Sequence, residues 1–452
     1  MVGLRTGRGA AVNALTDMRG SLRTFRVPAS WAFVTVTVSI LVVTAGILVF
    51  TRSHASTSPT VTGDVRVDAY PASAAADLQG VDPSVASGPN GTIGIVWEAI
   101  DPIVPTLDFT SETNLSFEIW YAVSADGGRT FSVPSLVTTA SECWRPTLSF
   151  GSNGIALVAA VCYPNSTAYV ELFHADPGST SFTAVTVTTG PGIDTGDAWV
   201  VVGLDGTIDV VYSGGLGVMV AEASAGGFTF GPPSLLVALA ASVTSASVSP
   251  TGTISLGLFS ENGLVSFVTW DGTVTPVPAH LFEPVNLSGS VYIDEPTLSI
   301  PGPAAAASGT SDFVVYITRD DTQLDLLRSS DGGVTWNSPL PLENVSNATL
   351  RMPAVVWDSE SGTLVVAWEE SSGGFWNTYA SVFSPGSGSL QPPLKVSSSD
   401  GYPTLVQNWH GTHLALAKVG PDDYCVAWND GRGNASPDVG FGHIYASIFS
   451  PA

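Results

Sequence analysis

Positive charge is scarce in most of this chain, so its few arginines are the first candidates for ligand chemistry. After residue 53 the sequence holds seven Arg and two Lys against 38 Asp and Glu. A guanidinium group can bind a planar anion through two parallel hydrogen bonds. Four arginines stand beside predicted strands and are our candidate ligand-binding residues: Arg145, Arg319, Arg351 and Arg432.

Other chemistries find little support in the residue types and their spacing. The six His include one close pair, His410 and His413, in a segment typical of paired strands, so we predict no zinc site. The pairs Asp320-Asp321 and Asp422-Asp423 could bind Ca²⁺, but solvated loop charge is the favoured interpretation. No nucleophile elbow, phosphate-binding loop or dinucleotide fingerprint stands in a strand-to-helix context. We expect no cofactor, and no nucleic-acid partner because a basic stripe is missing.

Two eight-residue segments of the chain match each other, and both have the composition of a hairpin turn. They are Ser-Ala-Asp-Gly-Gly-Arg-Thr-Phe at 124–131 and Ser-Ser-Asp-Gly-Gly-Val-Thr-Trp at 329–336. In such a turn the Asp accepts backbone N–H groups and the Gly pair supplies positive φ. The aromatic residue then begins a strand whose ring packs inward.

Weaker copies of this turn recur along the chain. The landmarks fall near positions 126, 176, 225, 271, 331 and 385. Neighbouring copies are therefore separated by about the period of a four-stranded propeller blade. A second landmark, a Pro-x-aliphatic strand followed by a hairpin and an apolar strand, begins at Pro83, Pro146, Pro296, Pro353 and Pro403, and the stretches 198–212 and 246–259 fill the gaps.

These repeats predict an all-β propeller of seven four-stranded blades. A six-bladed ring stays open if the weak unit 242–284 is an insertion. The segment Tyr379–Pro385 is repeated almost letter for letter as Tyr445–Pro451, after which no fourth strand follows. We expect the N-terminal strand Val65–Tyr70 to supply it, which would close the ring and remove both sheet edges.

The N-terminal region is typical of a membrane anchor. Five Arg and one acid between Met1 and Pro28 precede an uncharged stretch that runs from Ser30 to Phe50, which is long enough to span a bilayer. This pattern predicts a cytoplasmic basic segment (1–29), a transmembrane signal-anchor helix (30–51), a Ser/Thr-rich stalk (52–63) and an extracellular propeller (64–452) at the cell membrane. A cleaved signal peptide is the alternative, although this apolar run is longer than usual for one.

The cysteines and sequons agree with an extracellular location. Cys143 and Cys162 lie symmetrically about a Gly-Ser-Asn-Gly hairpin at 151–154, which predicts a cross-strand disulfide, with two buried thiols as the alternative. Asn-x-Ser/Thr sequons, which are candidate glycosylation sites, occur at Asn90, Asn114, Asn165, Asn286, Asn344, Asn347 and Asn434.

The repeated turns resemble the Asp-box, or bacterial neuraminidase repeat, of the sialidase superfamily. The resemblance covers nearly all of residues 64–452 and implies a propeller whose Asp-box turns lie on the perimeter, away from the catalytic funnel. Such turns also occur in non-enzymatic propellers. The residues that carry the resemblance are Ser124, Asp126, Gly128, Thr130, Phe131, Asp176, Gly178, Ser329, Asp331, Gly333, Thr335 and Trp336.

The resemblance also suggests roles for the four arginines. Their loops map to the face opposite the Asp-boxes, where the family holds a substrate carboxylate with three arginines. Arg351-Met352-Pro353 resembles the family's Arg-Ile-Pro motif, and Trp144-Arg145-Pro146 is a looser match. The family's motif lies in an early blade, whereas Arg351 opens the sixth unit here. Pairing with a neighbouring acid is the structural alternative, and Asp430 two residues before Arg432 is such an acid.

A retaining sialidase further needs a Tyr nucleophile, a Glu that assists it and an Asp general acid. Tyr402 and Glu295 stand just before first strands, and Asp101 or Asp108 could serve as the acid from the loop that follows Glu98. No motif supports these candidates, and ordinary loop roles are the alternative.

These observations predict a membrane-anchored, extracellular, sialidase-like propeller. We expect it to recognise a glycan or a cell-surface protein at its funnel face without catalysis, because the turns are degenerate and the catalytic set is incomplete. An exo-acting glycoside hydrolase of sialidase type is the competing hypothesis. A structural surface module without a ligand is the third.

Overall fold

The fold is seen in a computed structural model of the chain. It describes residues 58–451 except 73, 75–77, 102–115, 139–142, 164–166, 190–192, 240, 261–264, 272–302, 319–320, 403–413 and 433–441. These residues belong to one compact unit that begins at Ser58. The predicted segments 1–29 and 30–51 lie outside them. Over the described ranges, no helix has the length and apolar character to cross a membrane.

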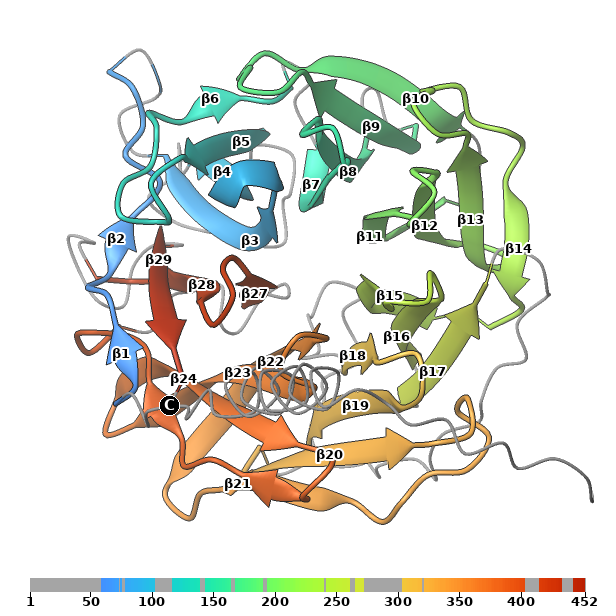
Figure 1. Ribbon diagram of the computed structural model, residues 1–452. Coiled ribbons are helices and arrows are strands. Elements are labelled where there is room, and N and C mark those ends of the chain that lie inside the picture. The colour runs from blue at the N-terminus through green and yellow to red at the C-terminus, as the bar shows by residue number, and fades with distance from the viewer. Residues whose placement is uncertain are drawn as a thin grey trace, which may run out of the picture. The chain divides into compact units, whose positions relative to one another are not determined.

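Seven antiparallel sheets stand around a common axis as blades (Figure 1). Blades 1 to 3 are β3 (Gln79–Ser87), β4 (Ile93–Asp101), β5 (Ser116–Ser124) and β6 (Ser135–Leu136); β7 (Cys143–Phe150), β8 (Ala156–Cys162), β9 (Tyr169–Ala175) and β10 (Thr183–Thr189); and β11 (Ile193–Val202), β12 (Ile208–Gly214), β13 (Gly217–Ala223) and β14 (Ser234–Val237). A short 3-10 turn, η1 (Pro89–Gly91), joins β3 to β4.

Blades 4 to 7 complete the ring. They are β15 (Ala241–Val248), β16 (Ile254–Ser260) and β17 (Val265–Trp270); β18 (Ala304–Ala307), β19 (Asp312–Ile317), β20 (Gln323–Ser329) and β21 (Leu340–Asn344); β22 (Ala348–Asp358), β23 (Thr363–Ser372), β24 (Phe375–Ser384), β25 (Ser389–Leu390) and β26 (Leu394–Lys395); and β27 (Ala415–Lys418), β28 (Tyr424–Asp430) and β29 (His443–Ser450) with β1 (Thr60–Val61) and β2 (Val65–Arg66).

The first strands of the blades form the inner circle. In order, β3, β7, β11, β15, β18, β22 and β27 each contact the next, and β27 contacts β3 again. The prediction of a seven-bladed all-β propeller is therefore confirmed. The six-bladed alternative is wrong, because residues 241–270 form the fourth blade instead of an insertion.

The ring is closed by the N-terminal segment, as predicted, but over a different range. Thr60 pairs with Ser450, and Val65 pairs with Ala446, both on β29. Pairing therefore begins inside the predicted stalk (52–63) and the paired strands end at Arg66 instead of Tyr70. The compact unit accordingly starts at Ser58 and not at residue 64.

The hydrophobic core lies mainly between blades. The second strand β8 is buried over its whole length, whereas the outer strand β10 alternates towards solvent. Strands covered on both faces are continuously apolar for this reason. One cluster combines Val96 and Ile119 of blade 1 with Val158 and Phe173 of blade 2. Packing between neighbouring blades therefore contributes to the stability of each blade.

The two matching turns are closed by the same hydrogen bonds. Ser124 Oγ donates to Asp126 Oδ1 at 2.8 Å and accepts the Gly128 N–H at 2.9 Å, and Thr130 Oγ1 donates to Asp126 Oδ2 at 2.7 Å. Ser329, Asp331, Gly333 and Thr335 repeat this pattern. The hydrogen bond from the threonine hydroxyl is the largest effect that lowers the pKa of Asp126, and of Asp331, to about 2.

The aromatic residue of each turn packs on the third strand of the preceding blade. Trp336 lies edge-on to Phe267 of β17, with ring centroids 5.3 Å apart. Phe182 meets Tyr121 of β5 at 5.2 Å, and Phe228 stacks on His174 of β9 at 3.8 Å. Phe131 packs against the cluster that contains Ile448 of β29. The perimeter turns therefore join neighbouring blades.

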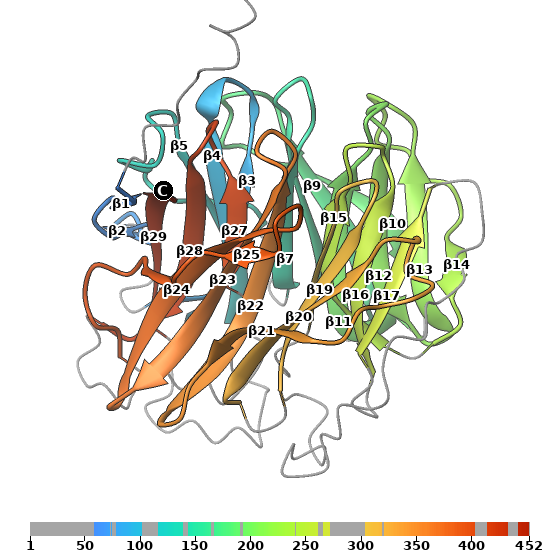
Figure 2. The same ribbon diagram turned by 60° about the horizontal axis from the view of Figure 1, so that its bottom comes forward.

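The antiparallel order gives the ring two distinct ends. Every first strand begins, and every second strand ends, at one end, which we call the loop face. The turns at Asp126 and Asp331 follow third strands and lie at the other end, the turn face. Figure 2 gives an oblique side view of these strands. The loop face is the predicted funnel face.

We predict that Trp336→Ala lowers the free energy of unfolding by about 2–3 kcal/mol, because a large inter-blade contact is lost. Val334 lies in the same turn and is 79% exposed. Val334→Ala should therefore change the free energy of unfolding by less than about 0.5 kcal/mol. Denaturant unfolding followed by circular dichroism measures both. Equal effects would contradict the inter-blade role of the aromatic ring.

Candidate functional site

Three first strands carry the same backbone irregularity at the loop face. The residue before a proline is left-handed in each of them: Asp82 (φ 48°), Arg145 (φ 47°) and Met352 (φ 53°). The strand register shifts at these points, which marks β-bulges. A residue before proline normally prefers extended backbone, so these conformations are held by the surrounding fold. Arg145 therefore lies at one of these β-bulges, and Arg351 directly precedes the left-handed residue of another.

Buried acids lie near the ends of the second strands of three blades, beside these bulges. Glu98, Glu369 and Asp430 are each less than 5% exposed. Glu98 Oε2 accepts the backbone N–H of Arg145 in the next blade at 2.9 Å. A buried carboxylate must find such donors to offset its lost hydration. The acid of one blade therefore helps to hold the bulge of the next.

Glu369 has a strongly raised pKa. It lies opposite Arg351 in the register of β22 and β23. Burial, and to a smaller extent the charge of Asp430, together raise the pKa of Glu369 to about 8, although the charge of Arg351 opposes both. Glu369 is therefore mostly protonated at neutral pH.

Arg351 lies over an aromatic ring at the loop face. Its guanidinium carbon is 5.0 Å from the centroid of the Trp376 ring, which is a cation–π contact. Trp376 and Gly401 exchange two backbone hydrogen bonds, at 3.1 and 2.9 Å. The hairpin from β23 to β24 is thereby joined to the connection that leads to blade 7.

Two exposed aromatic side chains stand next to this pair. The residues Phe375 and Tyr402 are 36% and 40% exposed, and their ring centroids are 5.6 Å apart at an interplanar angle of 64°. Phe375 directly precedes Trp376, and Tyr402 directly follows Gly401. We call Phe375, Trp376 and Tyr402 the aromatic rim.

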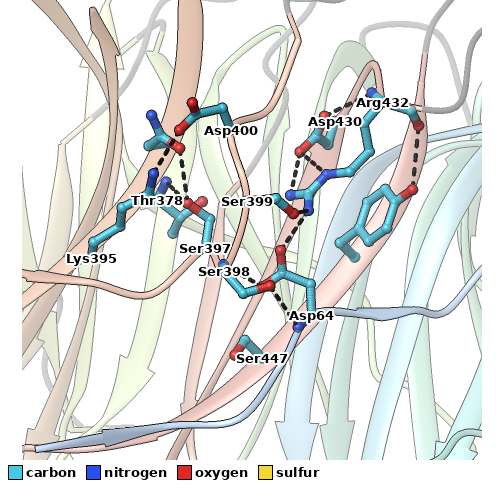
Figure 3. A network of polar contacts seen from close by, with 12 residues as sticks. Asp64, Thr378, Lys395, Ser397, Ser398, Ser399, Asp400, Asp430, Arg432 and Ser447 are labelled. Atoms are coloured by element: carbon cyan, nitrogen blue, oxygen red, sulfur yellow. Dashed lines mark hydrogen bonds and ion pairs between the residues drawn. The ribbon is translucent and has the colours of Figure 1, made fainter.

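Arg432 is taken up by contacts within the protein. Its Nη1 atom donates to Asp64 Oδ2 at 2.5 Å and to Ser399 Oγ at 2.6 Å, and its Nε atom donates to Asp430 Oδ2 at 2.6 Å (Figure 3). Its guanidinium also lies 4.4 Å from the ring centroid of Tyr445. The structure therefore places Arg432 in a structural network, which was the alternative to ligand contact.

The other sequence-predicted site residues are only partly brought together. Arg319 and Glu295 lie outside the described residues, and only the backbone of Asp101 is described, at the end of β4. Tyr402 gives its backbone N–H to Asp430 Oδ1 at 3.1 Å. Among the described side chains, no carboxylate is bonded to the Tyr402 hydroxyl. Tyr402 is therefore the only member of the predicted catalytic set whose side chain is described, and the set stays a prediction.

Cys143 and Cys162 occupy opposite positions of β7 and β8 and are joined by a disulfide, with their Cα atoms 4.0 Å apart. Trp144, next to Cys143, packs on Phe117 with ring centroids 4.7 Å apart. The disulfide thus lies at the loop-face end of blade 2, next to Arg145.

Sequence reasoning named Asp430 as a possible partner of Arg432 but missed the burial of Glu98 and Glu369 and most of the rim. A signal is present, because Glu98 and Glu369 each directly follow a Trp, and Asp430 follows Trp428 by two positions. An acid one or two positions after a Trp near the end of a second strand could have identified all three. In the part of the chain that the structure describes, no group of three His, Cys, Asp or Glu could hold a metal ion.

Comparisons with solved structures support the architecture. A protein of unknown function from Dyadobacter fermentans is 12% identical, with 87% of this chain and 100% of that chain covered and a TM-score of 0.53. An α-L-arabinofuranosidase of Fusarium graminearum is 15% identical (86% and 97% covered, TM-score 0.45). An intramolecular trans-sialidase from Ruminococcus gnavus is 11% identical (78% and 90% covered, TM-score 0.43).

These likenesses concern the fold alone. No protein-family model matches the chain, and no curated protein matches it either.

We predict that Glu369→Gln flattens the dependence of stability on pH. The folded-state pKa of Glu369 is raised from 4.5 to about 8, so the native protein binds a proton that the unfolded chain has lost across this window. Wild-type stability should therefore fall as pH rises from about 4.5 to 8. The variant should gain on the order of 2–4 kcal/mol over wild type at pH 9 and almost nothing at pH 4.

Thermal unfolding at both pH values measures this difference. Asp422→Asn is the control, because Asp422 is an exposed acid in the turn between β27 and β28. A Glu369→Gln gain that is the same at pH 4 and pH 9 would contradict the assignment of a buried neutral acid.

Proposed function

We propose that this chain is a membrane-anchored, sialidase-like propeller that recognises a glycan at its loop face without hydrolysing it. The observation that carries the proposal is the aromatic rim beside Arg351. In this proposal residues 30–51 hold the propeller at the outer surface of a cell. The perimeter turns are Asp-boxes in the sense of the family that they resemble.

The rim has the chemistry that sugar recognition needs. A sugar ring presents C–H groups on its faces, which pack on exposed aromatic rings such as Phe375 and Tyr402, and hydroxyl groups at its edge, which need polar partners. Tyr402 offers both a ring and a hydroxyl. Arg351 supplies positive charge in a chain of net charge −24, so a carboxylated sugar is favoured over a neutral one.

A binding role is also supported by how Tyr402 is held. Its ring packs on Phe375 and its backbone is bonded to Asp430, so the side chain is presented to solvent by a fixed support. Rigid aromatic groups bind with little loss of side-chain entropy, which suits recognition.

We predict that the full-length protein in detergent retains carboxylated oligosaccharides on a glycan array. Phe375→Ala and Tyr402→Ala should each weaken binding about tenfold or more, because each removes a stacking ring. Leu216→Ala is the matched control, since Leu216 is 77% exposed on the loop face of blade 3, in the turn between β12 and β13. Retention of no glycan, or equal losses in all three variants, would refute recognition at the rim.

An exo-acting glycoside hydrolase is the second candidate, and the pairing of Glu369 with Asp430 favours it. Glycosidases use two carboxyl groups, one kept protonated as the acid and one ionised. Glu369 is the protonated kind, and Asp430 acts on it electrostatically from the next blade. The burial of Glu369 argues against direct contact between this acid and a substrate, so recognition remains the preferred function.

Release of 4-methylumbelliferone from a panel of sugar conjugates separates these two functions. We expect no release by wild type, Arg351→Ala or Glu369→Gln. Release by wild type that falls more than about 100-fold in Glu369→Gln, the loss typical of removing a general acid, would establish the hydrolase and overturn the non-catalytic proposal.

A further inference from the structure

The segment that closes the ring also reaches the aromatic rim, through a chain of polar contacts. Asp64 lies between β1 and β2, and its carboxylate accepts the Ser398 N–H at 2.8 Å and the Arg432 Nη1–H at 2.5 Å. The Asp64 N–H in turn donates to Ser398 Oγ at 3.2 Å. Figure 3 shows Asp64 between Ser398 and Arg432. One N-terminal residue thereby binds the connection between blades 6 and 7.

Arg432 links Asp64 to Asp430, the residue that supports the rim. Its Nε atom and its backbone N–H donate to the two oxygens of Asp430, at 2.6 and 2.8 Å. Asp430 Oδ1 also accepts the Tyr402 N–H, and the Gly431 N–H donates to the Tyr402 carbonyl at 3.0 Å. The backbone of Tyr402 is therefore held from both sides by the loop that Arg432 fixes.

The fit around Gly401 leaves Tyr402 little freedom to move independently. A Cβ atom at Gly401 would lie 2.6 Å from Asp430 Oδ2 and 2.6 Å from the Trp376 carbonyl oxygen. The connection thus runs tightly between the Asp430 carboxylate and the rim strand β24. A shift of Asp430 must then move the backbone that carries Tyr402, and Trp376 with it.

We propose that Asp64 and Arg432 are positioning residues of the aromatic rim, so that the N-terminal segment sets the geometry of the ligand face as well as closing the ring. This inference rests on the proposed function for its consequence in binding. Asp64, Arg432 and Asp430 side chains are 4%, 14% and 3% exposed. Such charge-assisted bonds away from water are strong and directional, so they transmit position.

The same N-terminal segment holds a second, separate polar contact that serves as a control. Asp68 Oδ1 accepts a hydrogen bond from Arg66 Nε at 2.8 Å, and Asp68 Oδ2 lies 3.0 Å from His443 Nδ1. This set also ties the N-terminus to β29, where His443 pairs with Asp430 of β28, but no side-chain bond of Asp68 reaches residues 398–402 or 430–432. Loss of either set should loosen ring closure, but only loss of the Asp64 set should move the rim.

The test follows Tyr402 by fluorine NMR in the full chain labelled with 3-fluorotyrosine. The chain has 11 Tyr, and the Tyr402 signal is the one absent from Tyr402→Phe. We expect Asp64→Asn and Arg432→Lys to shift or broaden this signal, and Asp68→Asn to leave it unchanged. Should Asp64→Asn fail to fold, Ser399→Ala removes one exposed bond to Arg432 and should give a smaller shift of the same signal.

Binding of a carboxylated oligosaccharide retained on the array gives the second readout. Asp64→Asn should weaken it about tenfold and Asp68→Asn by less than about twofold, the difference expected for loss of one charge-assisted contact. An unmoved Tyr402 signal in folded Asp64→Asn and Ser399→Ala, or equal shifts in Asp64→Asn and Asp68→Asn, would overturn the inference. A selective shift in a protein that retains no oligosaccharide would uphold the positioning and defeat the proposed function.

Discussion

The pairing of residues 60–66 with β29 turns seven separate sheets into a ring. A sheet whose outer strand is missing exposes unpaired N–H and C=O groups, and a ring left open would also expose the apolar faces of its first and last blades. Because the strands that complete blade 7 come from the opposite end of the chain, both costs are removed by one set of contacts. The cluster that joins Val67 to Ile444 and Trp97 shows the apolar part of this closure.

Closure divides the molecule into an apolar interior and two polar ends with different tasks. At the turn face, serine and aspartate side chains satisfy backbone N–H groups, and the following aromatic ring packs on the neighbouring blade. At the loop face, β-bulges and buried carboxylates fix the positions of side chains near the point where the first strands begin. The first device is local in sequence and repeats around the ring. The second needs contacts between blades, as between Glu98 and the Arg145 N–H.

That difference explains what the sequence could predict. The turns at Asp126 and Asp331 were predictable because all their hydrogen-bond partners lie within the turn itself. Ring closure was predictable from the repeat of 379–385 at 445–451, although pairing at Thr60 was not, because its Ser/Thr-rich surroundings are typical of a stalk. The role of Arg432 could not be decided, since Asp430 is near it in sequence but Asp64 comes from the opposite end of the propeller sequence. The perturbed Glu369 escaped notice because its burial, and the effect of the Asp430 charge from the next blade, arise only in the folded ring.

The candidate site also lies where the ring is joined. The left-handed residues before proline occur in blades 1, 2 and 6, and the acids beside them, Glu98, Glu369 and Asp430, occur in blades 1, 6 and 7, although other buried acids such as Asp209 and Asp325 lie in blades 3 and 5. Elsewhere a loop-face residue meets side chains from its own blade and the next one. At the junction it also meets the N-terminal segment, which adds Asp64 to the groups available. A site built there can fix its side chains from more directions, and its precision then depends on the same contacts that keep the ring closed.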